Sequence, residues 1–210
     1  MTTHITFARH CEAAHNLRQT ERIGGRSNAA EPTPRGLYQA ALLGAYFRTE
    51  GSSFQAGYSS GAKRTDITLE ICEQAAGFEP RNFLRHVDER LLEVSQGKFD
   101  GMLRDRVYTP EAIELFRLNE LDGHLPTAES LMNAHARTRE CVLAIEANYP
   151  DASVLVVGHG LAIRAFAGIE LGLSKPAILG LQTDNVSLTE INVTGGVITV
   201  GEIGKTVIKE

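Results

Sequence analysis

The chain has 210 residues, of which 42% are hydrophobic and 22% are charged, and its formal net charge is -5 at pH 7. These values are typical of a soluble globular protein, and we expect a single domain over residues 1–210 that buries roughly 70% of its unfolded surface. The net negative charge argues against nucleic acid or an anionic membrane as the main partner. It does not argue against a small phosphorylated substrate, because a local cluster of arginines is sufficient to bind one.

The three cysteines, Cys11, Cys72 and Cys141, stand far apart in the chain. Their odd number and wide spacing argue against a disulfide framework and against a zinc site. No apolar stretch is long enough to span a bilayer, and the N-terminus lacks the basic and apolar regions of a secretory signal. We therefore expect a cytoplasmic protein, and the sequence indicates no metal and no cofactor.

Strand-like and helix-like segments alternate along the chain, which favours an α/β fold with a mainly parallel sheet. A polar loop over 16–32 follows the first strand, and Thr33-Pro34 then has the residue types of a helix start. The predicted strands are 3–9, 55–60, 83–92, 153–158, 186–193 and 197–203. The predicted helices are 34–51, 62–76, a short helix that begins at 109–111, 128–148 with Thr127 as its N-cap, and 161–172.

Residues 95–127 have the least regular pattern of the chain, and we expect them to form a small cap over one edge of the sheet. The last two strands, joined through Thr194-Gly195-Gly196, are predicted to pair with each other. An edge strand in the 186–203 region offers unpaired backbone groups, so a homodimer that pairs across a two-fold axis is one expectation.

Two short segments carry the strongest chemical signal, and each follows an apolar strand-like run. Arg9-His10 follows the first strand, and Gly158-His159-Gly160 follows the strand at 153–158. If both strands are parallel, their carboxyl ends lie along the same edge, where open α/β sheets bind ligands. An arginine holds phosphate oxygens in pairs, a neutral imidazole can attack phosphorus, and a helix that starts after Gly160 directs N–H groups at an anion. Taken singly, however, the first segment also fits a surface pair, and His159 also fits a residue that packs at a helix start.

Glu93 and Arg64 are two further candidates on the same edge. Glu93 stands where the third predicted strand ends, and its carboxylic acid could protonate a leaving alkoxide. Arg64 lies early in the second predicted helix and could reach the same pocket. Glutamate and arginine at such positions are more often exposed to solvent. Their positions in the sequence alone therefore do not assign a function to either residue.

The pieces together resemble a known family. Arg9-His10-Cys11-Glu12 with Asn16 resembles the Arg-His-Gly-Glu-Thr-x-x-Asn opening of the histidine phosphatase superfamily, which includes the cofactor-dependent phosphoglycerate mutases. Further fragments similar to the family's motifs follow in the same order over nearly the whole chain: Thr33-x-x-Gly36-x-x-Gln39-Ala40, Ser59-Ser60 with Arg64, Leu91-x-Glu93-x-x-x-Gly97-x-x-Asp100-Gly101, Pro126-x-x-Glu129-Ser130, Gly158-His159-Gly160 and Asn185-x-Ser187-x-Thr189.

The resemblance implies a doubly wound α/β fold with helices on both faces of the sheet, and catalysis through a phosphohistidine without a metal. His10 would be the nucleophile, and Glu93 would give a proton to the leaving group and later activate water. The residues that would bind the phosphate are Arg9, Asn16, Arg64, His159 and Gly160.

The chain departs from the family pattern at several positions. Cys11 stands where the family has glycine, so its side chain could crowd the phosphate or demand a different backbone angle. Ala13 replaces a threonine, and Ala128 replaces a glycine. His10-Cys11 also invites comparison with the cysteine-based phosphatases, but six residues separate Cys11 from Arg18 where that signature has five. A thiol at position 11 whose oxidation blocks the pocket is a further hypothesis.

These observations predict a metal-independent phosphatase that hydrolyses a small phosphomonoester. Phosphoglycerate mutase-type transfer is the first alternative, because Arg104, Arg106 and Arg117 could contact an acidic substrate. A phosphate-binding protein with weakened catalysis is the second, because Cys11 and Ala13 depart from the family pattern.

Overall fold

The computed structural model describes residues 1–17, 22–118, 121–122 and 127–208. A six-stranded sheet lies at its centre in the order β3-β2-β4-β1-β5-β6. The strands β3, β2, β4 and β1 are parallel to one another, whereas β5 is antiparallel to both of its neighbours, β1 and β6. The strands are β1 (Thr3–Arg9), β2 (Ala56–Ser59), β3 (Leu84–Val87), β4 (Ser153–Gly158), β5 (Leu188–Thr194) and β6 (Val197–Val200).

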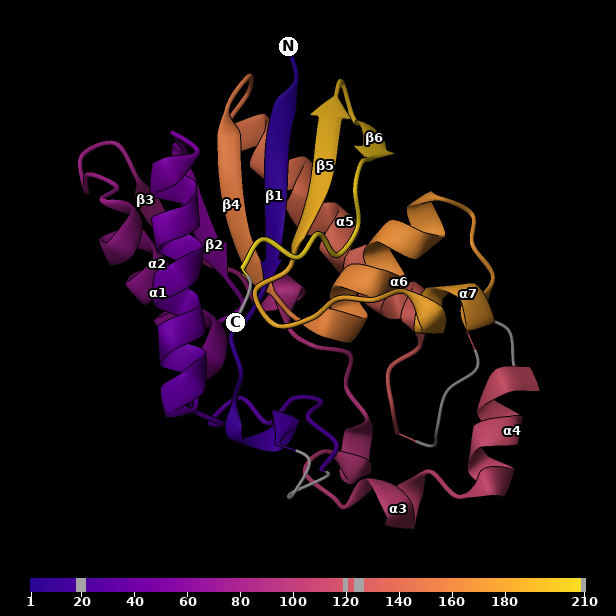
Figure 1. Ribbon diagram of the computed structural model, residues 1–210. Helices are drawn as coiled ribbons and strands as arrows, with labels where there is room; N and C mark the ends of the chain where they lie inside the picture. The colour runs from indigo at the N-terminus through magenta and orange to yellow at the C-terminus, as the bar shows by residue number, and fades with distance from the viewer. Residues whose placement is uncertain (18–21, 119–120, 123–126, 209–210) are drawn as a thin grey trace.

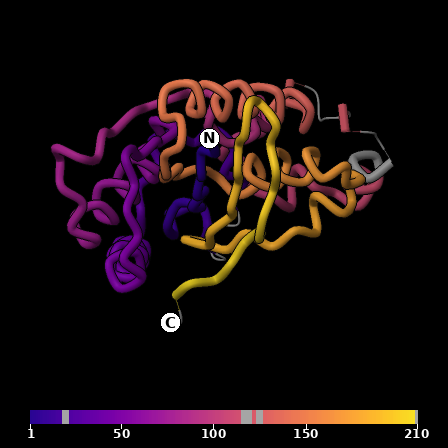
Figure 2. The backbone as a smooth tube through the Cα atoms, turned by 90° about the horizontal axis from the view of Figure 1, so that it is seen from above, coloured from indigo at the N-terminus to yellow at the C-terminus, as the bar shows by residue number. Residues whose placement is uncertain are grey.

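Helices cover both faces of the sheet, as the family resemblance implies (Figures 1 and 2). The helices α1 and α2 pack on one face, and α5 and α6 pack on the other. The α-helices are α1 (Pro34–Thr49), α2 (Lys63–Ala76), α3 (Arg104–Val107), α4 (Pro110–Leu118), α5 (Leu131–Asn148), α6 (Gly160–Glu170) and α7 (Lys175–Gly180). No helix within the described ranges is long and apolar enough to cross a membrane.

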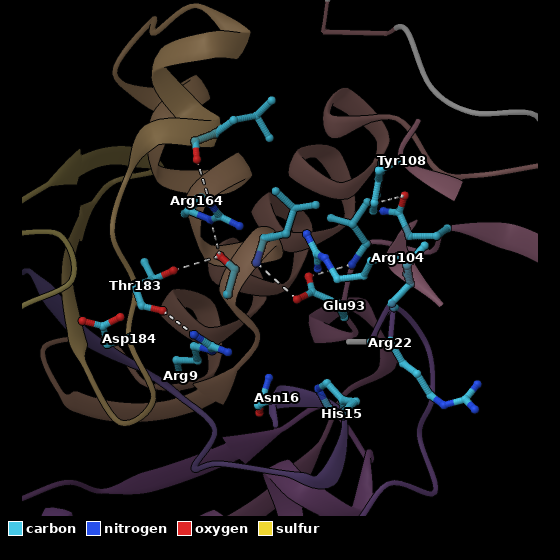
Figure 3. A pocket seen from close by; sticks show the side chains of 18 of the residues that line it. Arg9, His15, Asn16, Arg22, Glu93, Arg104, Tyr108, Arg164, Thr183 and Asp184 are labelled. Carbon is cyan, nitrogen blue, oxygen red and sulfur yellow. Dashed lines mark hydrogen bonds between the residues drawn. The ribbon is translucent and has the colours of Figure 1, made fainter. Parts of the chain in front are cut away.

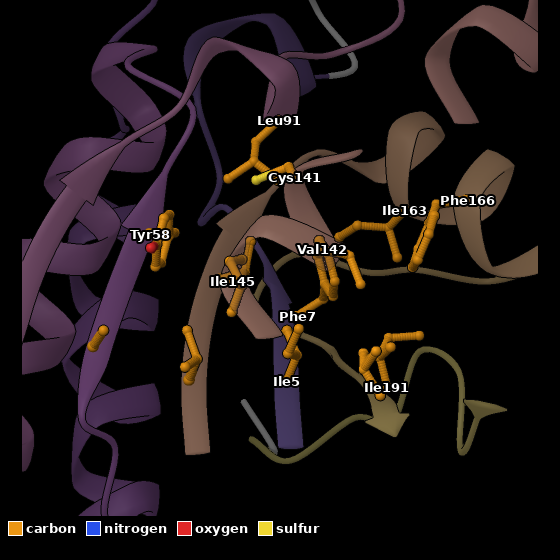
Figure 4. Close-up of a cluster of buried hydrophobic side chains, with 14 residues drawn as sticks. Ile5, Phe7, Tyr58, Leu91, Cys141, Val142, Ile145, Ile163, Phe166 and Ile191 are labelled. Atoms are coloured by element: carbon orange, nitrogen blue, oxygen red, sulfur yellow. The ribbon is translucent and has the colours of Figure 1, made fainter. Parts of the chain in front are cut away.

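The alternation of side chains along β1 explains the two layers. Ile5 and Phe7 point to the face that α5 and α6 cover, where Phe7 packs against Phe166 with ring centroids 5.8 Å apart (Figure 4). Ala8 points to the opposite face, where it meets Leu43 of α1. Successive side chains of a strand point to opposite faces, so a strand covered on both sides buries apolar residues on each of them, as Ile5, Phe7 and Ala8 do here.

The cap lies beyond the carboxyl ends of the parallel strands, as predicted for 95–127. It contains the short 3-10 turn over 97–99 together with α3 and α4. Figure 1 shows both helices below the strand ends and away from the layers that cover the sheet. This position leaves one edge of the sheet facing the cap.

Local residue chemistry explains where the predicted elements were correct. Thr33 caps α1, because its hydroxyl accepts a hydrogen bond of 3.0 Å from the Gly36 N–H. Gly77 ends α2 with φ 75, a left-handed conformation that glycine adopts without strain. The edge strand expected in the 186–203 region is β6, and the homodimer stays a prediction.

Three of the predicted boundaries were wrong for a local reason, and one helix was missed. Ser130, not Thr127, caps α5, because its hydroxyl accepts from the Asn133 N–H. The third strand ends at 87, because the Asp88 carboxylate caps a 3-10 turn. The fifth strand begins at 188 rather than 186, since Val186 has φ 56. The helix α7 was not predicted, although Pro176 stands in its first turn, where proline is favoured.

We predict that Gly44→Ala destabilises the protein, because α1 and α2 cross at this glycine. An added Cβ would lie 2.3 Å from the Cys72 carbonyl oxygen and 2.7 Å from the Ala75 Cβ, so the helices would have to separate. We expect a loss of about 1–3 kcal/mol in the free energy of unfolding, measured by urea denaturation. Gly180→Ala is the control, because nothing lies within 4 Å of its added Cβ. A loss as large in the control would contradict the explanation.

Candidate active site

The two histidines predicted to meet do lie side by side. Arg9 pairs in register with Gly158, so the neighbouring strands β1 and β4 end at the same level. The His10 and His159 rings are 5.3 Å apart between centroids and stand edge to face. The parallel register therefore brings together two segments that are far apart in the sequence.

His10 is buried, and its hydrogen bonds set its tautomer. Its Nδ1 lies 2.7 Å from the Cys11 carbonyl oxygen, which can only accept, so Nδ1 carries the proton and Nε2 keeps a lone pair. Burial lowers the pKa of His10 well below its ordinary value, and the charges of His159, Arg9 and Arg64 lower it further. The imidazole is therefore neutral at physiological pH, as a nitrogen nucleophile must be.

Arg64 is fully buried, and carbonyl groups of a loop hold its guanidinium. Its Nη1 donates to the Ser27 carbonyl at 2.8 Å, and its Nη2 to the Gly25 carbonyl at 3.2 Å. The same Nη2 lies 3.1 Å from His159 Nδ1, which must accept because a guanidinium only donates. The remaining His159 nitrogen, Nε2, then donates to the Ser60 hydroxyl at 2.8 Å. Both nitrogens of His159 have partners in this arrangement, and its contact with phosphate stays a prediction.

Glu93 occupies the N-terminus of α6. Its Oε1 accepts from the Ala162 N–H at 2.8 Å, and its Oε2 accepts from the Leu161 N–H at 3.2 Å. Two of the N–H groups that we expected to face a phosphate after Gly160 therefore hold a carboxylate of the protein itself. A carboxylate at a helix N-terminus is stabilised by the helix dipole, which fixes the position of this acid.

Glu129 anchors the loop that carries Glu93. Arg137 binds its two carboxylate oxygens through Nε at 2.7 Å and Nη2 at 2.9 Å, and the Ser95 N–H donates to Oε2 at 3.2 Å. Burial raises the pKa of Glu129, but the hydrogen bonds and charge of Arg137 outweigh it and keep the pKa below its ordinary value. The sequence analysis quoted Glu129 only as part of a motif, and its role as an anchor depends on contacts that spacing does not reveal.

A cavity of about 920 Å³ opens beside these residues (Figure 3). Of the predicted site residues, Arg9, Asn16, Glu93 and Gly160 line it, whereas His10, Arg64 and His159 lie buried next to it. Polar side chains that the sequence analysis did not assign to the pocket also line it: His15, Arg22, Gln96, Asp105, Tyr108, Arg164, Gln182, Thr183 and Asp184.

Three arginines were expected to contact an acidic substrate. Arg104 lines the cavity, but Arg106 does not. The side chain of Arg117 lies outside the described part of the chain.

Asn16, predicted to contact the phosphate, is held by its side-chain carbonyl, since Oδ1 accepts from the Ala13 N–H at 3.0 Å.

Several buried nitrogens in this region have no hydrogen-bond partner among the residues that the structure describes. They are Arg9 Nε, Arg64 Nε and His15 Nδ1. Arg9 is held by a bond of 2.7 Å from Nη1 to the Thr183 carbonyl. A Cβ on Gly160 would lie 3.3 Å from Arg9 Nε, so glycine leaves room for this guanidinium. Buried donors without partners are rare in native proteins, and a bound water or a polar ligand would satisfy these.

Cys11 does not crowd the pocket, contrary to our expectation. Its side chain is buried among α1 and α2 residues, and its Sγ accepts a hydrogen bond from the Thr68 hydroxyl at 3.1 Å. It is absent from the residues with positive φ, so the backbone needs no glycine here. Burial raises the pKa of the Cys11 thiol, which makes it a poor target for oxidants.

We predict that no cysteine reacts with a thiol reagent while the protein is folded. Cys11, Cys72 and Cys141 are all buried, and burial raises the pKa of each thiol. An absorbance assay should detect no reactive thiol under native conditions and three after unfolding. Rapid native modification of Cys11 that inorganic phosphate prevents would restore the oxidation hypothesis.

Known proteins with the same organisation were found by sequence and by structure. The model of the histidine phosphatase superfamily (branch 1) matches residues 5–206. A probable phosphoglycerate mutase of Serratia proteamaculans is 30% identical over 196 residues, which cover 90% of this chain and 84% of that protein. Phosphoserine phosphatase 1 of Hydrogenobacter thermophilus is 26% identical over 193 residues, which cover 90% of this chain and 85% of that protein.

Two solved structures illustrate the shared fold. YhfR of Bacillus stearothermophilus has a TM-score of 0.83 at 25% identity, with 97% of this chain and 98% of that chain covered. A mycobacterial glucosyl-3-phosphoglycerate phosphatase has a TM-score of 0.80 at 19% identity, with 98% and 100% covered. The family match over nearly the whole chain, with the site residues gathered at one sheet edge, leads to one conclusion: this chain belongs to the histidine phosphatase superfamily.

Proposed function

We propose that this protein is a metal-independent phosphatase that hydrolyses a small phosphate monoester through a phosphohistidine at His10. The observation that carries the proposal is the bond from His10 Nδ1 to the Cys11 carbonyl, which leaves the lone pair on Nε2. Arg9 and Arg64 lie close enough to lower the pKa of His10 through their charges, and each has a buried Nε without a partner in the described residues. This combination of a neutral nucleophile and unpaired cationic donors suits a phosphate dianion.

The first step transfers the phosphoryl group to the enzyme. His10 Nε2 attacks phosphorus, an N–P bond forms, and the bond from phosphorus to the leaving oxygen breaks. The negative charge of the bound phosphate dianion favours the protonated form of Glu93, which transfers its proton to that oxygen, so the leaving group departs as an alcohol. The ring becomes positively charged, and its Nδ1–H bond to the Cys11 carbonyl stabilises this charge.

The second step releases inorganic phosphate. The Glu93 carboxylate accepts a proton from a water molecule, whose oxygen attacks phosphorus and breaks the N–P bond. His10 returns to its neutral form with the lone pair on Nε2, and Glu93 is again protonated. The helix N–H groups that hold Glu93 keep it in place through both steps.

A small substrate with an additional acidic group fits the cavity. Arg22, Arg104 and Arg164 line it together with Arg9, and these four arginines outnumber the three carboxylates of the lining, which belong to Glu93, Asp105 and Asp184. The related proteins named above include a phosphoserine phosphatase and a probable phosphoglycerate mutase, whose names both imply substrates with a carboxylate. A volume of about 920 Å³ leaves space for a water molecule beside such a substrate.

We predict that His10→Ala and Glu93→Gln fail at different points. His10→Ala should abolish the acid-labile phosphoenzyme and all hydrolysis, because it removes the imidazole nitrogen that attacks phosphorus. Glu93→Gln should slow phosphoenzyme formation from an alkyl phosphate such as phosphoserine by about 100-fold or more, since the alkoxide needs a proton. With an aryl phosphate, whose leaving group is weakly basic, the loss in the same step should be at least tenfold smaller. Rapid-quench measurements isolate this step, and an equal loss with both substrates would remove Glu93 from the role of acid.

We predict that hydrolysis needs neither a metal nor a bisphosphate cofactor. Turnover of phosphoserine, phosphoglycerates and sugar phosphates should be unchanged by a chelator and should not require added 2,3-bisphosphoglycerate. Strict dependence on the bisphosphate, with isomerisation of a phosphoglycerate, would favour the mutase alternative. Absence of both activities and of any phosphoenzyme between pH 4 and 8 would favour a phosphate-binding protein.

A further inference from the structure

His15 is a titratable side chain of the cavity that the mechanism above does not use. Its ring lies edge to face with that of His10, with centroids 5.8 Å apart, and it lines the cavity beside Asn16 (Figure 3). The loop packs tightly on it: a Cβ on Gly24 would lie 2.7 Å from His15 Cδ2. The ring is therefore held next to the proposed nucleophile by close packing.

The hydrogen bonding of this ring is incomplete. His15 Nδ1 is buried and has no partner among the described residues, and the same holds for Arg9 Nε and Arg64 Nε. A phosphoryl group attacked by His10 must lie against that ring, beside the His15 ring that contacts it and the Arg9 side chain that lines the same cavity. Phosphate oxygens only accept hydrogen bonds when fully ionised, and an imidazole donates from both nitrogens only when it is protonated.

The charges around His15 explain its state before an anion binds. Burial lowers the pKa of His15 to about 4, and the charges of Arg64 and then Arg9 contribute to this shift. The titratable and charged groups that surround it in the site are Arg9, His10, Arg64 and His159, with Glu93 on the same cavity. A dianion placed among these groups offsets the two guanidinium charges and attracts a proton to the ring, so its arrival reverses the balance that keeps His15 neutral.

We propose that His15 is a third imidazole of the phosphate site, which takes up one proton from solvent when a doubly charged phosphoryl group binds and then donates a hydrogen bond to it. The inference rests on the proposed function, since it assigns a further binding residue to the same site. Its consequence follows from linkage: the complex holds one proton more than the free protein, so anion affinity rises as the pH falls.

Sulfate is the probe for this inference, because its charge stays at -2 from pH 5 to 8, whereas phosphate itself titrates there. We expect sulfate to bind the wild-type protein about tenfold more tightly at pH 5.5 than at pH 7.5, which corresponds to uptake of half a proton on average over these two pH units, as when the ring in the complex titrates near the middle of the range. In His15→Asn and His15→Phe the same change should be less than threefold. His4→Asn is the control, because His4 is an exposed histidine on β1 that bonds Asn192, and it should keep the full dependence.

Nuclear magnetic resonance of ring-labelled histidine tests the protonation directly. The signal that disappears in His15→Asn should titrate at a midpoint at least one pH unit higher with saturating sulfate than without it. An unchanged midpoint, or a full tenfold dependence retained in both His15 variants, would overturn the inference while hydrolysis through His10 stands. If wild-type protein neither binds sulfate nor forms a phosphoenzyme, the proposed function fails together with it.

Discussion

The site depends on keeping imidazole rings neutral beside buried guanidinium groups. His10 and His159 are both buried, and their rings lie side by side. Arg64 contacts His159 and is close enough to His10 to lower the pKa of that ring. Protonating either ring would add a positive charge to a region that already holds Arg9 and Arg64, and burial makes that costly. The site therefore has a positive potential with the lone pair of His10 Nε2 still available, a state that an anion stabilises and a cation does not.

The placement of Glu93 links two parts of the molecule. Its carboxylate binds the N-terminus of α6, whose N-cap residue is His159, so the proposed acid and the predicted phosphate pocket share one helix end. Glu129 and Arg137 hold the same loop from the side of α5. A shift of this loop would move the acid relative to the nucleophile, and even a small misplacement of reacting groups lowers rates substantially.

Much of the fold could be predicted from local chemistry. Thr33 and Gly77 mark helix ends through the hydroxyl cap and the left-handed backbone that they supply, and the apolar run at 153–158 forms the predicted strand in full. The errors fall where two local signals compete. Thr127 and Ser130 both have the side chain of an N-cap, and Thr127 takes φ 69, a left-handed conformation that an N-cap does not adopt. Only the packing of α5 decides between them.

The sequence by itself determined that Arg9-His10 and His159 stand at the ends of two apolar strands. The order of residues and the pattern of apolar side chains that mark a strand are local properties. It also determined the candidate acid, Glu93, through the order of motifs along the chain. The tertiary structure alone decided that Glu93 binds the N-terminus of α6, that Cys11 points into the core, and that His15 lies against His10. These outcomes depend on the register of neighbouring strands and on how loops fold over them, and both are set by contacts between residues that are distant in the chain.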